Sequence, residues 1–172
     1  MHKAPVDSAD LTTLVDYLHE QFDPSVTWDD AAAMAEEWDG AFAIKGISSV
    51  TDSLRAVEMG ATTLILSNHG GRQLDSTVSP IGLLPEVKQA VGDKVEIVVD
   101  GGIRRGTDIV KALALGASAC SIGRPYLYGL AAGGEEGAYK SLSLLKDEVQ
   151  NNMTLLGCTD VKKITSDHFR KL

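Results

Sequence analysis

VEIVVDGGIRRGTDIVKALALGASACSIG (residues 95–123) contains the complete pattern of a strand, a helix and a second strand. An apolar run ends at Asp100 and is followed by Gly101 and Gly102. Apolar residues then recur at helical spacing as far as Gly116, where a second apolar run begins. Two such runs joined by a helix are typical of neighbouring strands in a parallel sheet.

The same pattern continues on the N-terminal side of this stretch. The apolar runs lie at 41–45, 62–67, 95–100 and 117–122. Their residues are apolar almost throughout instead of alternating, which is typical of strands covered on both faces. Because a loop and a helical pattern follow each run, the sequence predicts an α/β protein with four βα units.

Four βα units suit either an open doubly wound sheet or part of a (β/α)8 barrel. The number of strands does not decide between these architectures. A complete barrel usually needs about 250 residues. The 172 residues of this chain therefore supply only about half of one.

Local signals predict where the helices begin and end. Thr51 is expected to cap a helix that buries Leu54 and Val57, and Thr107 to cap the helix that ends before Gly116. Other helices are expected over 28–38, after Pro80, and over 135–156. The segment 1–26 places apolar side chains on one helical face and is expected to be a lid or docking segment; they are Leu11, Leu14, Val15, Leu18 and Phe22.

Composition excludes several functions. The formal net charge is −8 and the pI is about 4.9, so nucleic acid is not an expected partner. No apolar stretch approaches the roughly 20 residues that a membrane helix needs. Cys120 and Cys158 are lone thiols in unrelated contexts, which favours a reducing compartment and a cytoplasmic location.

Two glycine-rich turns at the ends of the last two strands indicate an anion site. Asp100-Gly101-Gly102-Ile103-Arg104 brings backbone amides and a guanidinium to the start of a helix, and Gly123-Arg124 does the same one strand later. Glycines allow close approach, and helix N-termini and arginines favour anions. Either turn alone could be structural, with a solvated arginine. The pair on adjacent strands favours a phosphate.

A second group of polar residues points to acid–base chemistry. His69 and Arg72 lie three residues apart on a glycine-containing loop, where an imidazole can take a proton while a guanidinium binds a carboxylate. A structural histidine is the alternative. Lys45 is expected at the end of its strand, either facing an anion or extending to solvent.

Other sites are not indicated. The glycines at 101, 102 and 106 do not form a dinucleotide fingerprint, and no Walker loop is present. No cluster of histidine or cysteine has zinc spacing, so no metal is expected. Cys120 is expected in the core, Trp28 and Trp38 over the sheet, and His168 in solvent.

The motifs together resemble the FMN-dependent α-hydroxy-acid dehydrogenases. The resemblance runs from about Thr27 to Leu156, and the end of the chain is most similar to bacterial L-lactate dehydrogenases. The nine residues 67–75, SNHGGRQLD, are its most specific part. Further matches are Ile44-Lys45-Gly46, 100–108 (DGGIRRGTD) and Ile122-Gly123-Arg124-Pro125.

This resemblance implies specific roles around bound FMN. His69 would be the base that takes a proton during oxidation of the substrate α-carbon, and Arg72 would bind the substrate carboxylate. Lys45 would lie against the flavin N1 and C2 oxygen. The resemblance also implies that Ser67 contacts the flavin and that Asp100 contacts the ribityl or nearby chain. It implies contacts to the phosphate from Gly102, Arg104, Gly123 and Arg124.

The resemblance begins just before the fifth strand of the family's barrel. We therefore expect residues 27–172 to be the C-terminal half of an FMN-binding (β/α)8 barrel, completed by an N-terminal half or by self-association as a homo-oligomer. The expected reaction is oxidation of a small L-2-hydroxy acid, L-lactate foremost, to the 2-oxo acid. A non-catalytic half-barrel that binds FMN or phosphate, or a self-associating fragment, is the alternative. Peripheral association with the inner membrane is compatible with the expected cytoplasmic location.

Overall fold

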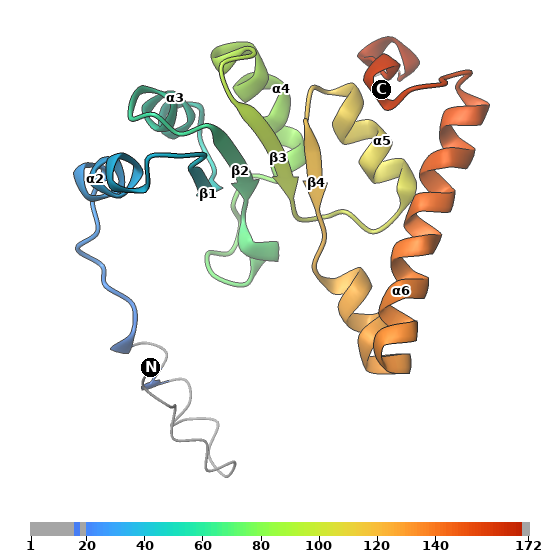
Figure 1. Cartoon of the computed structure of the whole chain (residues 1–172), viewed down its shortest axis with the longest axis horizontal. Coiled ribbons are helices and arrows are strands. Elements are labelled where there is room, and N and C mark those ends of the chain that lie inside the picture. Colours follow the sequence, from blue (N-terminus) through green and yellow to red (C-terminus); the bar gives the residue numbers. More distant parts are fainter. Residues whose placement is uncertain (1–15, 18–19, 170–172) are drawn as a thin grey trace.

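Four parallel strands form one sheet in chain order (Figure 1). The computed structural model describes residues 16–17 and 20–169. The strands are β1 (Ala43–Ile47), β2 (Thr63–Ser67), β3 (Glu96–Asp100) and β4 (Ala119–Ser121). All four predicted strands are confirmed, although β1 begins and ends two residues later than expected. Most of the proposed lid segment, including Leu11, Leu14, Val15 and Leu18, lies outside the described residues.

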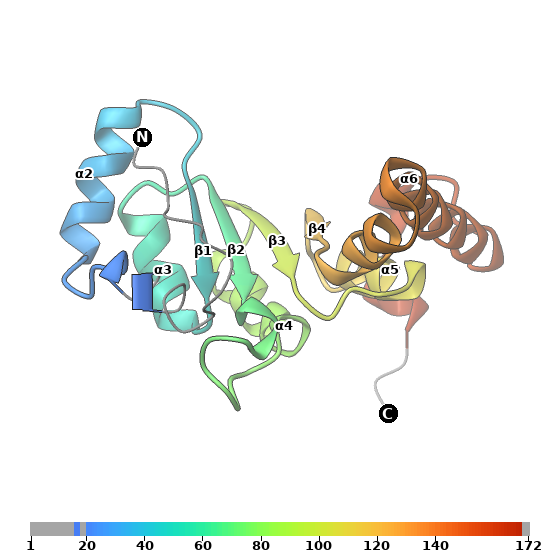
Figure 2. The same cartoon turned by 90° about the horizontal axis from the view of Figure 1, so that it is seen from below.

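Helix α2 (Trp28–Trp38) precedes the first strand, and one α-helix follows each strand. The helices that follow the strands are α3 (Val50–Glu58), α4 (Pro80–Val91), α5 (Gly106–Ala114) and α6 (Arg124–Leu155), with short 3-10 helices at His69–Gly71, Val161–Lys163 and Ser166–His168. Helices α2 and α6 lie at opposite ends of the sheet (Figure 2). The predicted α/β architecture with four βα units is confirmed.

The two faces of the sheet differ in burial. Leu64, Leu66, Ile97 and Val99 are fully buried and form the core together with Leu84 of α4. The alternate positions of β2 and β3, such as Ile65 and Val98, remain half-buried. The expectation of strands covered on both faces is therefore wrong for this chain, because one face packs against helices and the other is only half-covered.

The first turns of α3 and α5 are capped by residues other than the two threonines expected from the sequence. Ser49 caps α3, because its hydroxyl accepts a hydrogen bond from the Asp52 amide at 3.0 Å. Thr51 consequently lies within the first turn, and Leu54 is 39% exposed rather than buried. Thr107 lies inside α5, whose start is held by the carboxylate of Asp108. The side-chain oxygens that accept from the first backbone amides thus belong to Ser49 and Asp108 instead of Thr51 and Thr107.

Helix α6 turns back on itself at Gly133 and Gly134, which have non-helical backbone angles. Its second arm covers the helix predicted over 135–156, and Leu145 is buried there. The first arm was not predicted. The arms approach so closely at Gly129 that an added Cβ would lie 2.8 Å from the carbonyl carbon of Gly137.

Trp28, Trp38 and His168 differ in how far they are buried. Trp28 packs against the core and below the guanidinium of Arg55, 5.7 Å from its ring centroid. Trp38 is 67% exposed, so it does not cover the sheet as expected. His168 is half-buried instead of solvated, with Nε2 3.2 Å from Cys158 Sγ, because the C-terminal segment folds against α5 and α6. Within the described ranges, no helix is long and apolar enough to cross a membrane.

Candidate functional site

The predicted site residues gather at the carboxyl ends of the strands. Strand register places Lys45 beside Ile65, Ser67 beside Asp100, and Asp100 beside Ser121. Because side chains alternate along a strand, these polar residues share the half-covered face, opposite the face that carries Leu66 and Val99. The helix-covered face thus stabilises the fold, and the other face presents the polar groups.

Lys45, Ser67 and Asp100 form one polar cluster across three strands. Lys45 Nζ lies 2.8 Å from Asp100 Oδ2 and donates to Ser67 Oγ at 3.3 Å. The Ser67 hydroxyl donates to the same Asp100 oxygen at 2.6 Å, and Ser67 is buried. Lys45 therefore faces an anion, as one of the two sequence interpretations proposed.

The environment of Asp100 keeps this carboxyl ionised. Burial by itself would raise the pKa of Asp100. Hydrogen bonds from Lys45, Ser67 and Ser121, together with the positive charge of Lys45, outweigh burial and lower the pKa below its ordinary value. The cluster thus combines a lysine ammonium with a carboxylate at neutral pH.

The position of Lys45 corrects one detail of the sequence analysis. Lys45 is the third residue of β1 and not its last, because the strand continues through Gly46 to Ile47. The register with β2 shifts between Lys45 and Ile47, and Gly46 has φ +98°. Such a bulge re-aims neighbouring side chains, and glycine accepts the left-handed backbone that it needs.

The loop after β2 holds His69 in an uncommon conformation. His69, Gly70 and Gly71 have φ values of 52°, 66° and 70°. For a residue other than glycine this left-handed conformation is unfavourable. Ser67 Oγ accepts from the His69 amide at 3.1 Å, and Asn68 Oδ1 accepts from the Gly70 amide at 3.0 Å.

Asn68 supports the loop that presents His69, a role that was not predicted from the sequence. Its side chain closes the turn that presents His69, and its carbonyl accepts from the Gly71 amide at 2.9 Å. Asparagine commonly forms such turns with its own backbone. That preference is the signal that could have identified Asn68 from the sequence.

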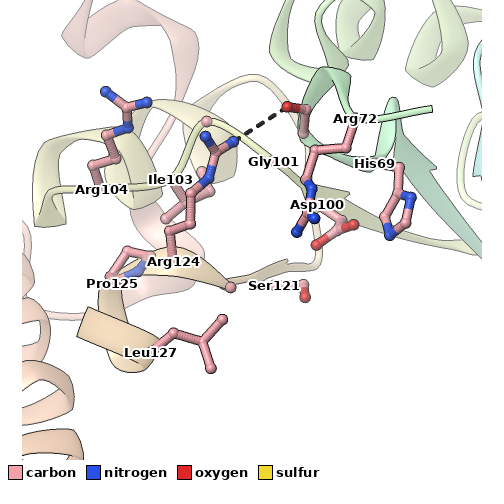
Figure 3. Close-up of a pocket in the computed structure, with 13 residues that line it drawn as sticks. His69, Arg72, Asp100, Gly101, Ile103, Arg104, Ser121, Arg124, Pro125 and Leu127 are labelled. Carbon is pink, nitrogen blue, oxygen red and sulfur yellow. Dashed lines mark hydrogen bonds between the residues drawn. The ribbon is translucent and has the colours of Figure 1, made fainter. Parts of the chain in front are cut away.

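The turns after β3 and β4 line one pocket with His69 and Arg72. Figure 3 shows the guanidinium groups of Arg72, Arg104 and Arg124 around it. At Gly102 and Gly123 an added Cβ would meet no atom within 4 Å, so both turns border open space. Arginines and a helix N-terminus beside open backbone can hold a phosphate.

The start of α5 is occupied by carboxylates of the protein itself. Asp108 Oδ2 accepts from the amides of Arg104 and Arg105 at 2.9 Å each. Glu148 Oε2 of α6 accepts from the Gly106 amide at 2.6 Å. The backbone amides of Arg104, Arg105 and Gly106 are therefore already bonded and are not free to bind the expected anion.

Glu148 was also missed by the sequence analysis. Its Oε1 lies 2.7 Å from Arg105 Nη2 and accepts from Arg105 Nε at 2.8 Å. Because Glu148 lies more than 40 residues after Arg105 on another helix, sequence spacing carries no signal for this contact. The bonds from Glu148 hold α6 against the segment that follows Arg104.

All nine predicted site residues lie around two pockets that share His69. The first pocket includes the phosphate-site residues and Arg72, and the second is lined by Lys45 and Ser67. The pocket lined by arginines and glycine turns and the pocket lined by Lys45 and Ser67 therefore both border His69. In the described part of the chain, no cluster of three metal-ligating side chains is present.

Comparison with known proteins gives consistent relatives. Residues 2–171 match the family of FMN-dependent dehydrogenases. The chain is 47% identical over 151 residues to an L-lactate oxidase of Nostoc sp., covering 88% of the chain and 41% of that relative. It is 45% identical over 159 residues to an L-lactate dehydrogenase of Pectobacterium atrosepticum, covering 91% and 41% respectively.

A solved structure shares the fold over nearly the whole chain. It is that of (S)-mandelate dehydrogenase, described as a monotopic membrane protein. The TM-score is 0.88 at 38% identity, with 97% of this chain and 44% of that one covered. This chain therefore spans about two fifths of the length of its curated relatives, and its four strands form part of an α/β barrel.

Proposed function

Because the chain belongs to the family of FMN-dependent dehydrogenases, we propose that it supplies the base and the phosphate site for oxidation of an L-2-hydroxy acid. L-Lactate is the proposed substrate, and the 2-oxo acid pyruvate the product. The two relatives that are named for L-lactate support this choice over mandelate. The observation that carries the proposal is the meeting of both pockets at His69.

The residues present fit FMN. A phosphate fits the open space beside Gly102 and Gly123, where Arg104 and Arg124 supply positive charge. The second pocket, lined by Lys45 and Ser67, is the proposed position of the ring. When bound, FMN supplies the acceptor for two electrons, which amino-acid side chains do not provide.

His69 is the proposed base. Its exposed imidazole lies at the junction of the pockets, where its ring nitrogen can accept a proton from a bound hydroxy acid. The amide of His69 is fixed by Ser67, the residue that also holds Asp100, so the base and the ring pocket share one support. Fixed geometry of this kind raises the efficiency of proton transfer.

Arg72 and Lys45 are proposed to bind and stabilise negatively charged groups. Arg72 lies in the same loop as His69 and lines the first pocket, from which its guanidinium can bind a carboxylate. Lys45 is proposed to stabilise negative charge on the ring. Its salt bridge to Asp100 holds the ammonium over the strand ends, although the Lys45 side chain is half exposed.

The test is a visible absorption spectrum of the purified chain with FMN, before and after anaerobic addition of L-lactate. We expect the flavin band to bleach with the chain and to persist with His69→Gln, which keeps the FMN contacts. (S)-Mandelate and glycolate, run in parallel, are expected to bleach it more slowly.

Three results would contradict the proposal. Bleaching by His69→Gln at the rate of the unaltered chain would remove the base assignment. A bound flavin that L-lactate never bleaches would reduce the chain to a binding module. Absence of flavin binding, with elution as an oligomer, would favour the self-associating alternative.

A further inference from the structure

We propose that Arg124 joins the phosphate pocket to the His69 loop, so that an anion bound by Arg124 also fixes the backbone that carries His69. This inference rests on the proposed function for the identity of the anion, the FMN phosphate. It assigns Arg124 a second role, as a positioning residue for the base.

The direct contact is a hydrogen bond between two distant loops. Arg124 Nη2 donates to the Gly70 carbonyl at 3.3 Å, across 54 residues of sequence (Figure 3). An added Cβ at Gly70 would lie 2.8 Å from the same nitrogen. With φ +66°, Gly70 provides both the left-handed backbone and the space that lets the guanidinium approach.

The guanidinium can serve both partners at once. Arginine carries five N–H donors in one plane, and the bond to Gly70 uses a single donor. Arg124 is the first residue of α6 and lines the pocket between the turns after β3 and β4. The remaining donors can therefore bind an anion while Gly70 stays bonded. A lysine ammonium lacks this planar arrangement.

The His69 loop depends on a contact of this kind because the hydrogen bonds of its amides join only residues next to it in sequence. The amides of His69, Gly70 and Gly71 bond to Ser67 and Asn68, which belong to the same strand end. Residues 71–76 are exposed, and His69 has an unfavourable φ of 52°. Exposed loops with few buried contacts open at low free-energy cost. Arg124 ties this loop to the carboxyl end of a different strand, β4.

Arg104 provides a matched comparison. It lines the same pocket and carries the same charge. In Figure 3 its side chain lies on the side of Arg124 that faces away from His69. Among the described residues, Arg124 donates a hydrogen bond to the Gly70 carbonyl, and Arg104 donates none to it. Loss of the guanidinium at either position should weaken anion binding, whereas only its loss at Arg124 should affect the loop.

The experiment measures amide hydrogen exchange of the peptide spanning residues 68–75, with and without saturating inorganic phosphate. In the unaltered chain we expect phosphate to slow this exchange by about tenfold, the factor typical of one hydrogen bond to a charged group. Arg124→Lys is expected to bind phosphate more weakly and, at saturation, to leave the exchange rate unchanged. Arg104→Lys is expected to need a higher phosphate concentration for saturation. At saturation it should still show the full slowing of amide exchange over residues 68–75.

Two outcomes would overturn the inference. One is exchange in the unaltered chain that does not respond to phosphate, whether or not phosphate binds. The other is Arg124→Lys with the same slowing as Arg104→Lys. Because the readout needs neither flavin nor substrate, loop protection without oxidation of a 2-hydroxy acid would refute the proposed function and leave the role of Arg124 standing.

Discussion

Replacing Gly106 by alanine is expected to force α5 and α6 apart at the edge of the proposed phosphate site. Gly106 is buried at the start of α5 and its amide donates to Glu148 of α6. An added Cβ would lie 2.6 Å from the amide nitrogen of Val149 and 2.7 Å from the carbonyl carbon of Glu148. Because these are backbone atoms, no side-chain rotation can relieve the overlap.

The magnitude follows from two opposing effects. Overpacking of a close contact typically costs about 1–3 kcal/mol, and backbone overlap favours the upper end. Alanine is a better helix former than glycine by up to about 1 kcal/mol, which offsets part of the cost. We therefore expect a net destabilisation of about 2 kcal/mol, equivalent to a fall in Tm of roughly 4–8 °C for a chain of this size.

Thermal unfolding followed by circular dichroism measures this change, and phosphate affinity measures its effect on the site. The matched control is Thr107→Ala, one residue further along the same helix and exposed, which should shift Tm by less than about 2 °C. It also tests Thr107 as a cap, because loss of a true threonine cap would cost about 1 kcal/mol. An unchanged or raised Tm for Gly106→Ala would refute the close approach of the two helices.

Three further perturbations test other parts of the account. Because the pKa of Asp100 is lowered in the folded chain, its carboxylate contributes stability above the ordinary pKa of 3.8, and this contribution is lost as the pH falls below that value. Asp100→Asn should therefore lower Tm at pH 7 and have a smaller effect at pH 3. Burial, assisted by the charge of Asp108, raises the pKa of the Cys120 thiol to about 11. Alkylation of Cys120 by iodoacetamide should therefore be slow at pH 8. The stability that the neutral thiol contributes below pH 9 should be lost as the pH rises toward 11. Leu84→Ala removes a fully buried side chain of α4 and should cost about 2–5 kcal/mol in urea unfolding.

The strands and the site residues could be predicted from the sequence because local patterns encode them. Runs of apolar residues ending in polar or glycine-rich loops located β1 to β4 within two residues. Carboxyl ends of parallel strands meet at one edge, which is why Lys45, Ser67 and Asp100 could be expected together. The helix ends were less predictable, since Ser49 and Thr51 are both capable caps and the position of the chain decides between them.

The remaining features depend on contacts between distant segments. The bond of Glu148 to Gly106 and that of Arg124 to Gly70 join residues 42 and 54 positions apart. No periodicity or spacing signals such pairs. The exposure of Trp38 and the half-burial of His168 likewise depend on how the helices and the C-terminal segment pack, which composition does not determine.

The most direct test of the central claim compares the binding of FMN with that of riboflavin, which lacks the phosphate, by quenching of flavin fluorescence. The account predicts that FMN binds, that riboflavin binds at least tenfold more weakly, and that inorganic phosphate competes with FMN for the site lined by Gly102, Arg104, Gly123 and Arg124. Equal affinity for FMN and riboflavin, or FMN binding unaffected by phosphate, would contradict it.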